Sequence, residues 1–344
     1  MADNQNIEMR KQRWQNFWEK TNGSNYMFWI NYTPDQLERP LLWPEKSRER
    51  VEWAWRSYCL HQERTKWLED DSIPYLDMLT GTEVFAEAFG CKIHRPEDNN
   101  PFALPLVHNS SEAAKIKPVN LFSSTLTILF EMADELASKA GPEAVFKMVD
   151  VQSPMDIAAL IWDKNDFYIA LVEEPEAVKE LSAKVEELLT AFLDEWFRRY
   201  GKGFIAHYPN YYMPYGITLS EDEIGMVSEA VFMEMFYDEL VKLSEKYGAM
   251  GMHCCANAMH QWNNIKKIPN LKLINLCQPD NVIRKSWECF PGQIAQMPSW
   301  CGEGEPWTWP VQHPAGTRMV LEATANSREQ ALELSEKMRK ACGR

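Results

Sequence analysis

Short apolar segments alternate with amphipathic helices over most of this 344-residue chain, and this order constrains the fold more than any other feature. Short buried strands separated by helices are typical of parallel βα units. We expect strands at 27–32, 73–79, 146–153, 203–207, 216–220, 271–277, 292–297 and 318–323, and in the stretch that begins at Gly248. Because 203–207 and 216–220 compete for one core position, about eight strands remain, the number that closes a (β/α)8 TIM barrel.

The clearest helix follows Pro175, where apolar residues recur at helical spacing opposite a row of acidic residues. These apolar residues are Val178, Leu181, Val185, Leu188, Phe192 and Trp196. A second helix, over 5–20, has Trp14, Phe17 and Trp18 on one face. Because no linker interrupts the chain, we expect one compact unit. Residues 1–70 would form an N-terminal helical extension with the first strand, packed on a barrel of residues 71–344.

The charge balance excludes some classes of partner. The chain has 36 basic and 50 acidic residues, a net charge of −14. Nucleic acids and anionic membranes attract clustered positive charge, so we expect neither as a partner. No apolar run approaches the ~20 residues of a membrane span, and the charged N-terminus lacks the apolar region of a signal peptide. We therefore expect a cytoplasmic protein whose eight cysteines are reduced.

The stretch 248–265, GAMGMHCCANAMHQWNNI, combines histidines and cysteines behind a short apolar run. Imidazole and thiolate are the usual zinc ligands, and residues i and i+2 of a strand point to the same side. His253 and Cys255 could therefore bind one metal ion together, while Cys254 would point the other way. The alternative is that the two cysteines are small buried hydrophobic residues.

Polar side chains also follow several of the other expected strands. In a barrel of this kind the active site lies at the carboxyl ends of the strands. The residues that would meet there are Asp77, Asp150, Glu221, His253, Cys255 and Cys301. Aromatic residues are frequent in the nearby loops 208–215 and 300–309, where they could line a pocket for a flat or cationic ligand or simply cover the core. This convergence favours the metal-binding interpretation.

Four segments in one order resemble the uroporphyrinogen decarboxylase superfamily, which includes the zinc-dependent corrinoid and coenzyme M methyltransferases. They are YLDMLTGTEVFAEAFGCKI at 75–93, VQSPMDIAALI at 151–161, TLSEDEIGMVSEAVFMEMFYDELVKL at 218–243 and MHCCAN at 252–257. The resemblance implies a TIM barrel. It also implies an enzyme of either the decarboxylase or the methyltransferase branch.

The decarboxylase branch is matched only in part. Asp77 corresponds to a conserved strand aspartate of that branch, but FWINYTPDQL lacks its arginine-rich motif near the first strand. Guanidinium groups bind carboxylates in a bidentate manner, so a porphyrinogen would lose its clamp. Leu160 stands where the branch has a tyrosine, and MVLEATANS lacks its C-terminal histidine.

The methyltransferase branch binds zinc through a His-x-Cys pair and a later cysteine. His253 and Cys255 match the pair, including the Asn257 that often follows. Around the last strand, where the later cysteine usually lies, this chain has Ala-Thr-Ala at 323–325. Cys301 is the nearest substitute, and Cys277, at the end of the neighbouring strand, is the alternative.

We therefore expect a zinc-dependent methyl- or alkyltransferase that moves a one-carbon group between a corrinoid protein, or a methylated small molecule, and a thiol or corrinoid acceptor. The expected metal ligands are His253, Cys255 and Cys301; the expected acid, base or additional ligand groups are Asp77, Asp150 and Glu221; and the expected substrate contacts are His207, Tyr208, Asn257 and Trp262. His207 also fits a structural role. A decarboxylase and a non-catalytic barrel that binds a ligand or a corrinoid protein remain alternatives. A homodimer is compatible with the resemblance, because relatives often pair through a barrel face, but the sequence does not determine the oligomeric state.

Overall fold

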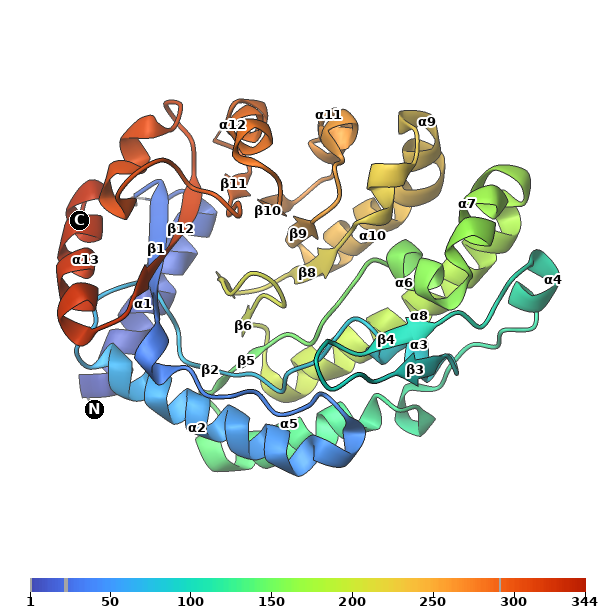
Figure 1. Ribbon diagram of the computed structural model, residues 1–344, viewed down its shortest axis with the longest axis horizontal. Helices are drawn as coiled ribbons and strands as arrows, with labels where there is room; N and C mark the ends of the chain where they lie inside the picture. The colour runs from blue at the N-terminus through green and yellow to red at the C-terminus, as the bar shows by residue number, and fades with distance from the viewer. Residues whose placement is uncertain (1, 22–23, 291) are drawn as a thin grey trace.

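The computed structural model describes residues 2–21, 24–290 and 292–344, in which helices surround two mainly parallel β-sheets (Figure 1). One sheet has six strands in the order β1-β12-β11-β10-β9-β8, and the other has four in the order β2-β5-β6-β7. The larger sheet contains β1 (Tyr26–Tyr32), β8 (Ile217–Ser220), β9 (Met250–Cys254), β10 (Leu271–Leu276), β11 (Ala295–Gln296) and β12 (Met319–Ala325). The smaller sheet contains β2 (Tyr75–Leu76), β5 (Val145–Lys147), β6 (Phe204–Ile205) and β7 (Tyr212–Met213).

Helices cover the outer faces of these sheets, as expected for βα units (Figure 1). They are α1 (Ala2–Glu19), α2 (Ser47–Thr65), α3 (Val84–Ala88), α4 (Ser110–Ala113), α5 (Thr127–Ala140), α6 (Pro154–Ile161), α7 (Lys164–Glu173), α8 (Pro175–Tyr200), α9 (Glu229–Val231), α10 (Tyr237–Tyr247), α11 (Trp262–Ile265), α12 (Asp280–Cys289) and α13 (Arg328–Ala341). The apolar stripe predicted for α8 is buried throughout. None of the described helices is long and apolar enough to cross a membrane.

The α/β architecture is confirmed, but the strands do not form the continuous eight-stranded ring that we expected. Both candidate strands 203–207 and 216–220 are present, as β6 and β8. β6, which forms an antiparallel hairpin with β7, pairs with Phe146 and Lys147 of β5. β8 meets the same chain segment only after β5, at a bridge between Ser220 and Gln152. At the other junction, the Asp71 N–H donates to the Phe28 carbonyl (2.9 Å). A few hydrogen bonds at each junction, rather than a continuous ladder, therefore join the two sheets.

Two further segments differ from the expected elements. The helix expected before β9 is divided into α9 and α10 by a π-helical turn, Phe232–Phe236. The proline-rich segment between α3 and α5 contains a small hairpin of β3 (Lys92–His94) and β4 (Phe102–Leu104). Both differences lie outside the six-stranded and four-stranded sheets, and they leave the order of the core strands unchanged.

The N-terminal helix α1 is held to the sheets by buried polar contacts. Arg10 pairs with Asp70 at 2.6 Å, and both side chains are buried. The Asp70 and Asp71 carboxylates also accept hydrogen bonds from the backbone of Ile30 and Phe28 in β1. Since β1 continues the sheet beside β12, these aspartates connect α1 to the edge of the six-stranded sheet.

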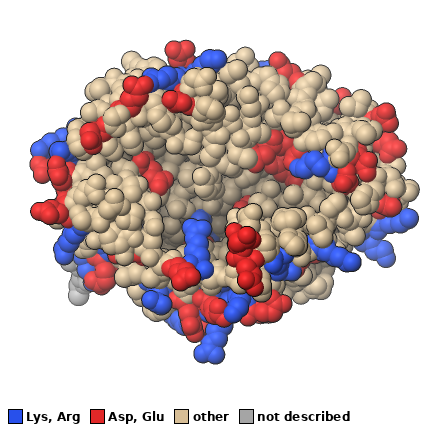
Figure 2. Space-filling model, in the orientation of Figure 1, with Lys and Arg blue, Asp and Glu red and all other residues tan. Residues whose placement is uncertain are grey.

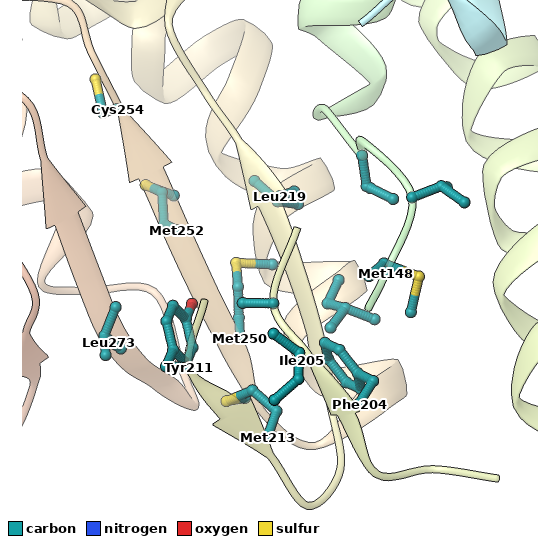
Figure 3. Close-up of a cluster of buried hydrophobic side chains, with 14 of the residues drawn as sticks. Met148, Phe204, Ile205, Tyr211, Met213, Leu219, Met250, Met252, Cys254 and Leu273 are labelled. Carbon is teal, nitrogen blue, oxygen red and sulfur yellow. The ribbon is translucent and has the colours of Figure 1, made fainter. Parts of the chain in front are cut away.

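Apolar side chains from the strands and the surrounding helices form one core. Figure 3 shows Met250, Met252 and Cys254 along β9, with Phe204 and Ile205 nearby. These side chains are buried. The face seen in Figure 2 is hollowed at its centre, with acidic and basic side chains at its lower rim. The carboxyl ends of the strands are therefore the accessible end of the core.

Candidate metal centre

Three potential metal ligands converge at the ends of β8 and β9. The ligand atoms of Asp222, His253 and Cys255 all lie within 4.8 Å of one another. Among the described residues, these form the group of histidine, cysteine and acidic side chains that could hold a metal ion. Carboxylate oxygen, imidazole nitrogen and thiolate sulfur are all established zinc ligands, so the donor set fits zinc.

Parallel pairing of the two strands explains the convergence. Ser220 stands opposite His253 in the β8–β9 ladder, and the Glu221 N–H donates to the His253 carbonyl (2.9 Å). Side chains at i and i+2 of an extended chain point to the same side, so Cys255 points to the same side as His253, and Asp222 points to the same side as Ser220. Cys254 is buried in the row of Met250 and Met252 (Figure 3). The predicted division between Cys255 and Cys254 is confirmed.

The imidazole of His253 is held by Asn275 on the next strand, β10. The Nδ1 atom of His253 is hydrogen-bonded to Oδ1 of Asn275, and the Asn275 amide nitrogen donates to the Met297 carbonyl. Because the second bond defines which end of the amide accepts, His253 Nδ1 must be the donor. Its Nε2 lone pair is then available to a metal, the arrangement that commonly orients a histidine ligand.

Two tyrosines, Tyr208 and Tyr211, also lie near His253. The Tyr208 ring packs edge-on against His253, with 4.8 Å between the ring centroids. Two residues before His253, Gly251 lacks a side chain, and a Cβ there would overlap the Tyr211 hydroxyl group. Tyr211 is buried, and its hydroxyl group packs against the backbone of β9 at Gly251, on the core side of His253.

Two hydrogen bonds connect Cys255 with Asp222. Cys255 Sγ lies 3.0 Å from Asp222 Oδ2, and the Cys255 N–H donates to Asp222 Oδ1 at 2.6 Å. Burial, and then the adjacent Asp222 carboxylate, raise the pKa of the Cys255 thiol to about 12. Without a cation the thiol thus keeps its proton. A divalent cation shared by the two groups would reverse this preference, because it stabilises both anions.

The loop that carries Asp222 is anchored by buried carboxyl groups. Asp156 accepts hydrogen bonds from the N–H groups of Asp222 (2.7 Å) and Glu223 (3.0 Å). Burial, and then the charge of Asp156, raise the pKa of Glu221 well above its usual value. Burial also raises the pKa of Asp156, to about 7, but the hydrogen bond from the Asp222 N–H favours its anion, so Glu221 is the partner that holds the proton. Glu221, a predicted catalytic residue, therefore lies in the buried cluster beneath the metal group.

Two other predicted carboxylates line a separate part of the open end. Asp77 and Asp150 contribute to a cavity of about 380 Å³, together with the buried His207. Asp77 is paired with Lys147 at 3.1 Å. The two ring nitrogens of His207 contact the hydroxyl groups of Thr218 (3.0 Å) and Ser220 (2.9 Å), and burial holds the pKa of this imidazole well below its usual value. His207 is thus neutral and held in place.

The remaining predicted residues have different surroundings. Asn257 is exposed, whereas Trp262 is buried against Phe290 with 5.6 Å between the ring centroids. Cys301 is buried, and its sulfur lies 3.9 Å from the Pro298 carbonyl, outside the group of three ligands. Cys277 follows β10, in the position beside Cys255, and its sulfur lies 3.9 Å from the Tyr208 hydroxyl.

The sequence analysis selected Glu221 and missed its neighbour Asp222. Strand parity carried a usable signal. The predicted strand ends at Ser220, and Asp222 is two residues further, so the two share a side while Glu221 points away. Asn275 was also missed, because an asparagine in an apolar strand shows no metal partner until the pairing of β9 with β10 is known.

Comparison with known proteins identifies the family and the fold. The model of the uroporphyrinogen decarboxylase family matches residues 70–283, more than half of the chain. The chain belongs to the uroporphyrinogen decarboxylase family. The matched segment of this family member includes Asp222, His253 and Cys255. No curated protein sequence matches the chain.

A solved structure shares the fold of this uroporphyrinogen decarboxylase family member. A methyltransferase from Methanosarcina mazei aligns with a TM-score of 0.68 over 97% of this chain and 98% of that chain, at 10% sequence identity. This similarity extends beyond the family match to both ends of the chain. At such low identity it concerns the fold.

Proposed function

We propose that this protein is a zinc-dependent methyl- or alkyltransferase built on a (β/α)8 barrel. The observation that carries the proposal is the convergence of Asp222, His253 and Cys255, whose ligand atoms lie within 4.8 Å of one another at the open end of the strands. Family membership and a methyltransferase of similar fold support an enzyme of this type. The acceptor is a small thiol, and the donor is a methylated corrinoid protein or a methylated small molecule.

Zinc with an open coordination position would hold the acceptor thiol as a thiolate near neutral pH. The residues of this chain prepare the site for that role. Asn275 directs the free Nε2 of His253 toward the metal position, and Asp156 holds the backbone of Asp222. Cys255 is exposed, so the side of the site that it forms can be reached from solvent.

The decarboxylase alternative has less support from the cavity. A porphyrinogen carries several carboxylates, and each needs a cationic partner. The cavity near Asp77 is lined by two basic side chains, Arg39 and Lys147, and Lys147 is already paired with Asp77. One uncommitted guanidinium group suits a ligand with a single anionic group better than a porphyrinogen.

Metal analysis of the purified protein tests the ligand assignment. We expect one zinc per chain in the wild type, and strongly reduced zinc in His253→Ala, Cys255→Ser and Asp222→Ala. His260→Gln and Cys289→Ser are matched controls, because His260 is bonded to the Val227 carbonyl and Cys289 lies on α12. Stoichiometric zinc that survives the three ligand substitutions would refute the site.

Methyl transfer is tested with methylcobalamin and mercaptoethanol. The methyl carbon leaves cobalt without the bonding electron pair and bonds to sulfur, so cob(I)alamin, a methyl thioether and a proton are formed. The absorbance of cob(I)alamin follows the reaction under anaerobic conditions. Transfer that requires zinc and is lost in Cys255→Ser supports the proposal. Zinc-replete protein that is inactive with every corrinoid or methylated donor and thiol tested would favour a non-catalytic barrel, and porphyrin products formed from a porphyrinogen would favour a decarboxylase.

A further inference from the structure

A cavity of about 380 Å³ opens beside the candidate metal centre. It lies between the ends of β2 and β5 and the loop segments 39–43 and 96–100. Two of its lining residues, His207 and Asp150, connect it to the metal group. His207 is bonded to Ser220, which pairs with His253, and the charges of Lys147 and Asp222 both act on the Asp150 carboxylate. A molecule in the cavity therefore has one end close to the metal ligands.

Some charged groups of the cavity are paired with each other, and others are not. Asp77 and Lys147 neutralise each other at 3.1 Å, and their side chains are only 13% and 16% exposed. Within the described part of the chain, neither the Arg39 guanidinium nor the Asp150 carboxylate has a hydrogen-bond or ion-pair partner. The cavity thus offers one uncommitted cation and one uncommitted anion.

Further acidic groups define which ligands are disfavoured. Glu97 and Asp98 line the same cavity and, like Asp150, are not paired with a basic side chain among the described residues. This excess of carboxylates disfavours a ligand that carries only anionic groups. Leu42, Trp43 and Met148 line the same cavity and supply apolar surface. Such surface suits the methyl groups of an onium ion, whose charge is spread and weakly hydrated.

We infer that this cavity binds a small zwitterion with an N- or S-methylated onium group. Its carboxylate pairs with Arg39, and its onium group lies against Asp150, toward the metal centre. Binding of such a betaine does not depend on the metal, whereas its use as the methyl donor rests on the proposed transferase function. In that use, the bond between the onium atom and the methyl carbon breaks. The electron pair stays on nitrogen or sulfur, and the carbon bonds to the acceptor thiolate.

Calorimetric binding of glycine betaine tests the inference, with acetate and tetramethylammonium as half-ligands. We expect glycine betaine to bind more tightly than either half-ligand. Arg39→Gln and Asp150→Asn should each weaken its binding by about 10- to 100-fold, the effect of losing one interaction with a charged group. Arg48→Gln and Asp194→Asn, which remove exposed charges elsewhere, are matched controls and should leave the affinity unchanged.

The same titration with the His253→Ala/Cys255→Ser double variant separates the cavity from the metal site. Unchanged betaine affinity in this variant is expected, and failure of the transferase proposal would not alter it. Acetate or tetramethylammonium binding as tightly as glycine betaine would overturn the inference. So would betaine affinity that is insensitive to both Arg39→Gln and Asp150→Asn in variants that melt at the wild-type temperature.

Discussion

The Nδ1 atom of His253 is hydrogen-bonded to the side-chain oxygen of Asn275 on the neighbouring strand. This bond occupies one imidazole nitrogen and leaves the other free for a metal, so the orientation of the candidate ligand depends on a residue outside the group of three.

Substitution of Asn275 should therefore weaken metal binding without removing a ligand. We expect Asn275→Ala to lower zinc affinity by about 10- to 100-fold, the usual effect of losing a partner that orients a ligand. Competition with a chromophoric chelator measures the affinity. Asn257→Ala, at an exposed position two residues after Cys255, is the control. Equal affinities of the two variants would show that Asn275 does not orient His253.

The two cysteines proposed as further ligands should differ in effect. Cys277 follows β10 beside Cys255, whereas the Cys301 sulfur is buried against the Pro298 carbonyl. We expect Cys277→Ser to reduce zinc affinity by about tenfold or more and Cys301→Ser to have little effect. In cobalt(II)-substituted protein, Cys277→Ser should also weaken the thiolate-to-metal absorption band. The reverse ranking would favour Cys301 over Cys277 as the additional cysteine ligand.

Asp156 should contribute to both stability and metal binding. Its carboxylate accepts the N–H groups of Asp222 and Glu223, and Asn can accept through only one oxygen. One buried N–H would then lose its partner, so we expect Asp156→Asn to reduce the free energy of unfolding by about 1–3 kcal/mol. Urea denaturation measures this change, and zinc affinity should fall in parallel. Wild-type zinc affinity in a destabilised variant would separate folding from positioning of Asp222.

Stability should fall as the pH rises from weakly acidic to alkaline values. Burial raises the pKa of Glu239 from 4.5 to about 8 in the folded protein. The folded state therefore holds a proton that the unfolded state has lost, and the associated stability is present below pH 4.5 and lost as the pH rises through about 8. In the wild type the Met155 N–H and the Ser182 hydroxyl group both donate to Glu239; in Glu239→Gln the amide oxygen can still accept from the Met155 N–H, and the amide N–H group can donate to the Ser182 oxygen.

This variant should consequently lose less stability than the wild type between about pH 5 and pH 9 in urea titrations. Part of the dependence will remain, because burial also raises the pKa of Glu83 and Glu322 to about 7. Parallel curves for Glu239→Gln and the wild type would mean that Glu239 is ionised in the folded protein.

The buried ion pair between α1 and the sheets should be important for stability. Arg10→Met would leave the fully buried Asp70 carboxylate without its charged partner, at a cost of about 3–5 kcal/mol. Arg48→Met breaks an exposed pair with Glu52 and should cost about 0–1 kcal/mol. Thermal and urea unfolding distinguish the two. Similar stabilities would show that α1 contributes little to the folded unit.

Much of the architecture was predictable because strands and helices have characteristic apolar spacing. The stripe of α8 and the alternation of His253 and Cys255 depend only on local geometry, and both are confirmed. How the strands join at the two junctions between the sheets was not predictable from the sequence. Whether β6 or β8 continues the sheet depends on how the β6–β7 hairpin pairs with β5, and no periodicity within either segment reports that pairing.

The sequence alone determined that His253 and Cys255 share a side of their strand, because adjacent residues of an extended chain alternate. The tertiary structure alone decided which distant groups join them. Asp222 follows β8, Asn275 lies on β10, and Arg39 and Asp150 line one cavity although they come from distant segments. These combinations depend on strand order and loop packing, which arise from contacts between residues far apart in the chain.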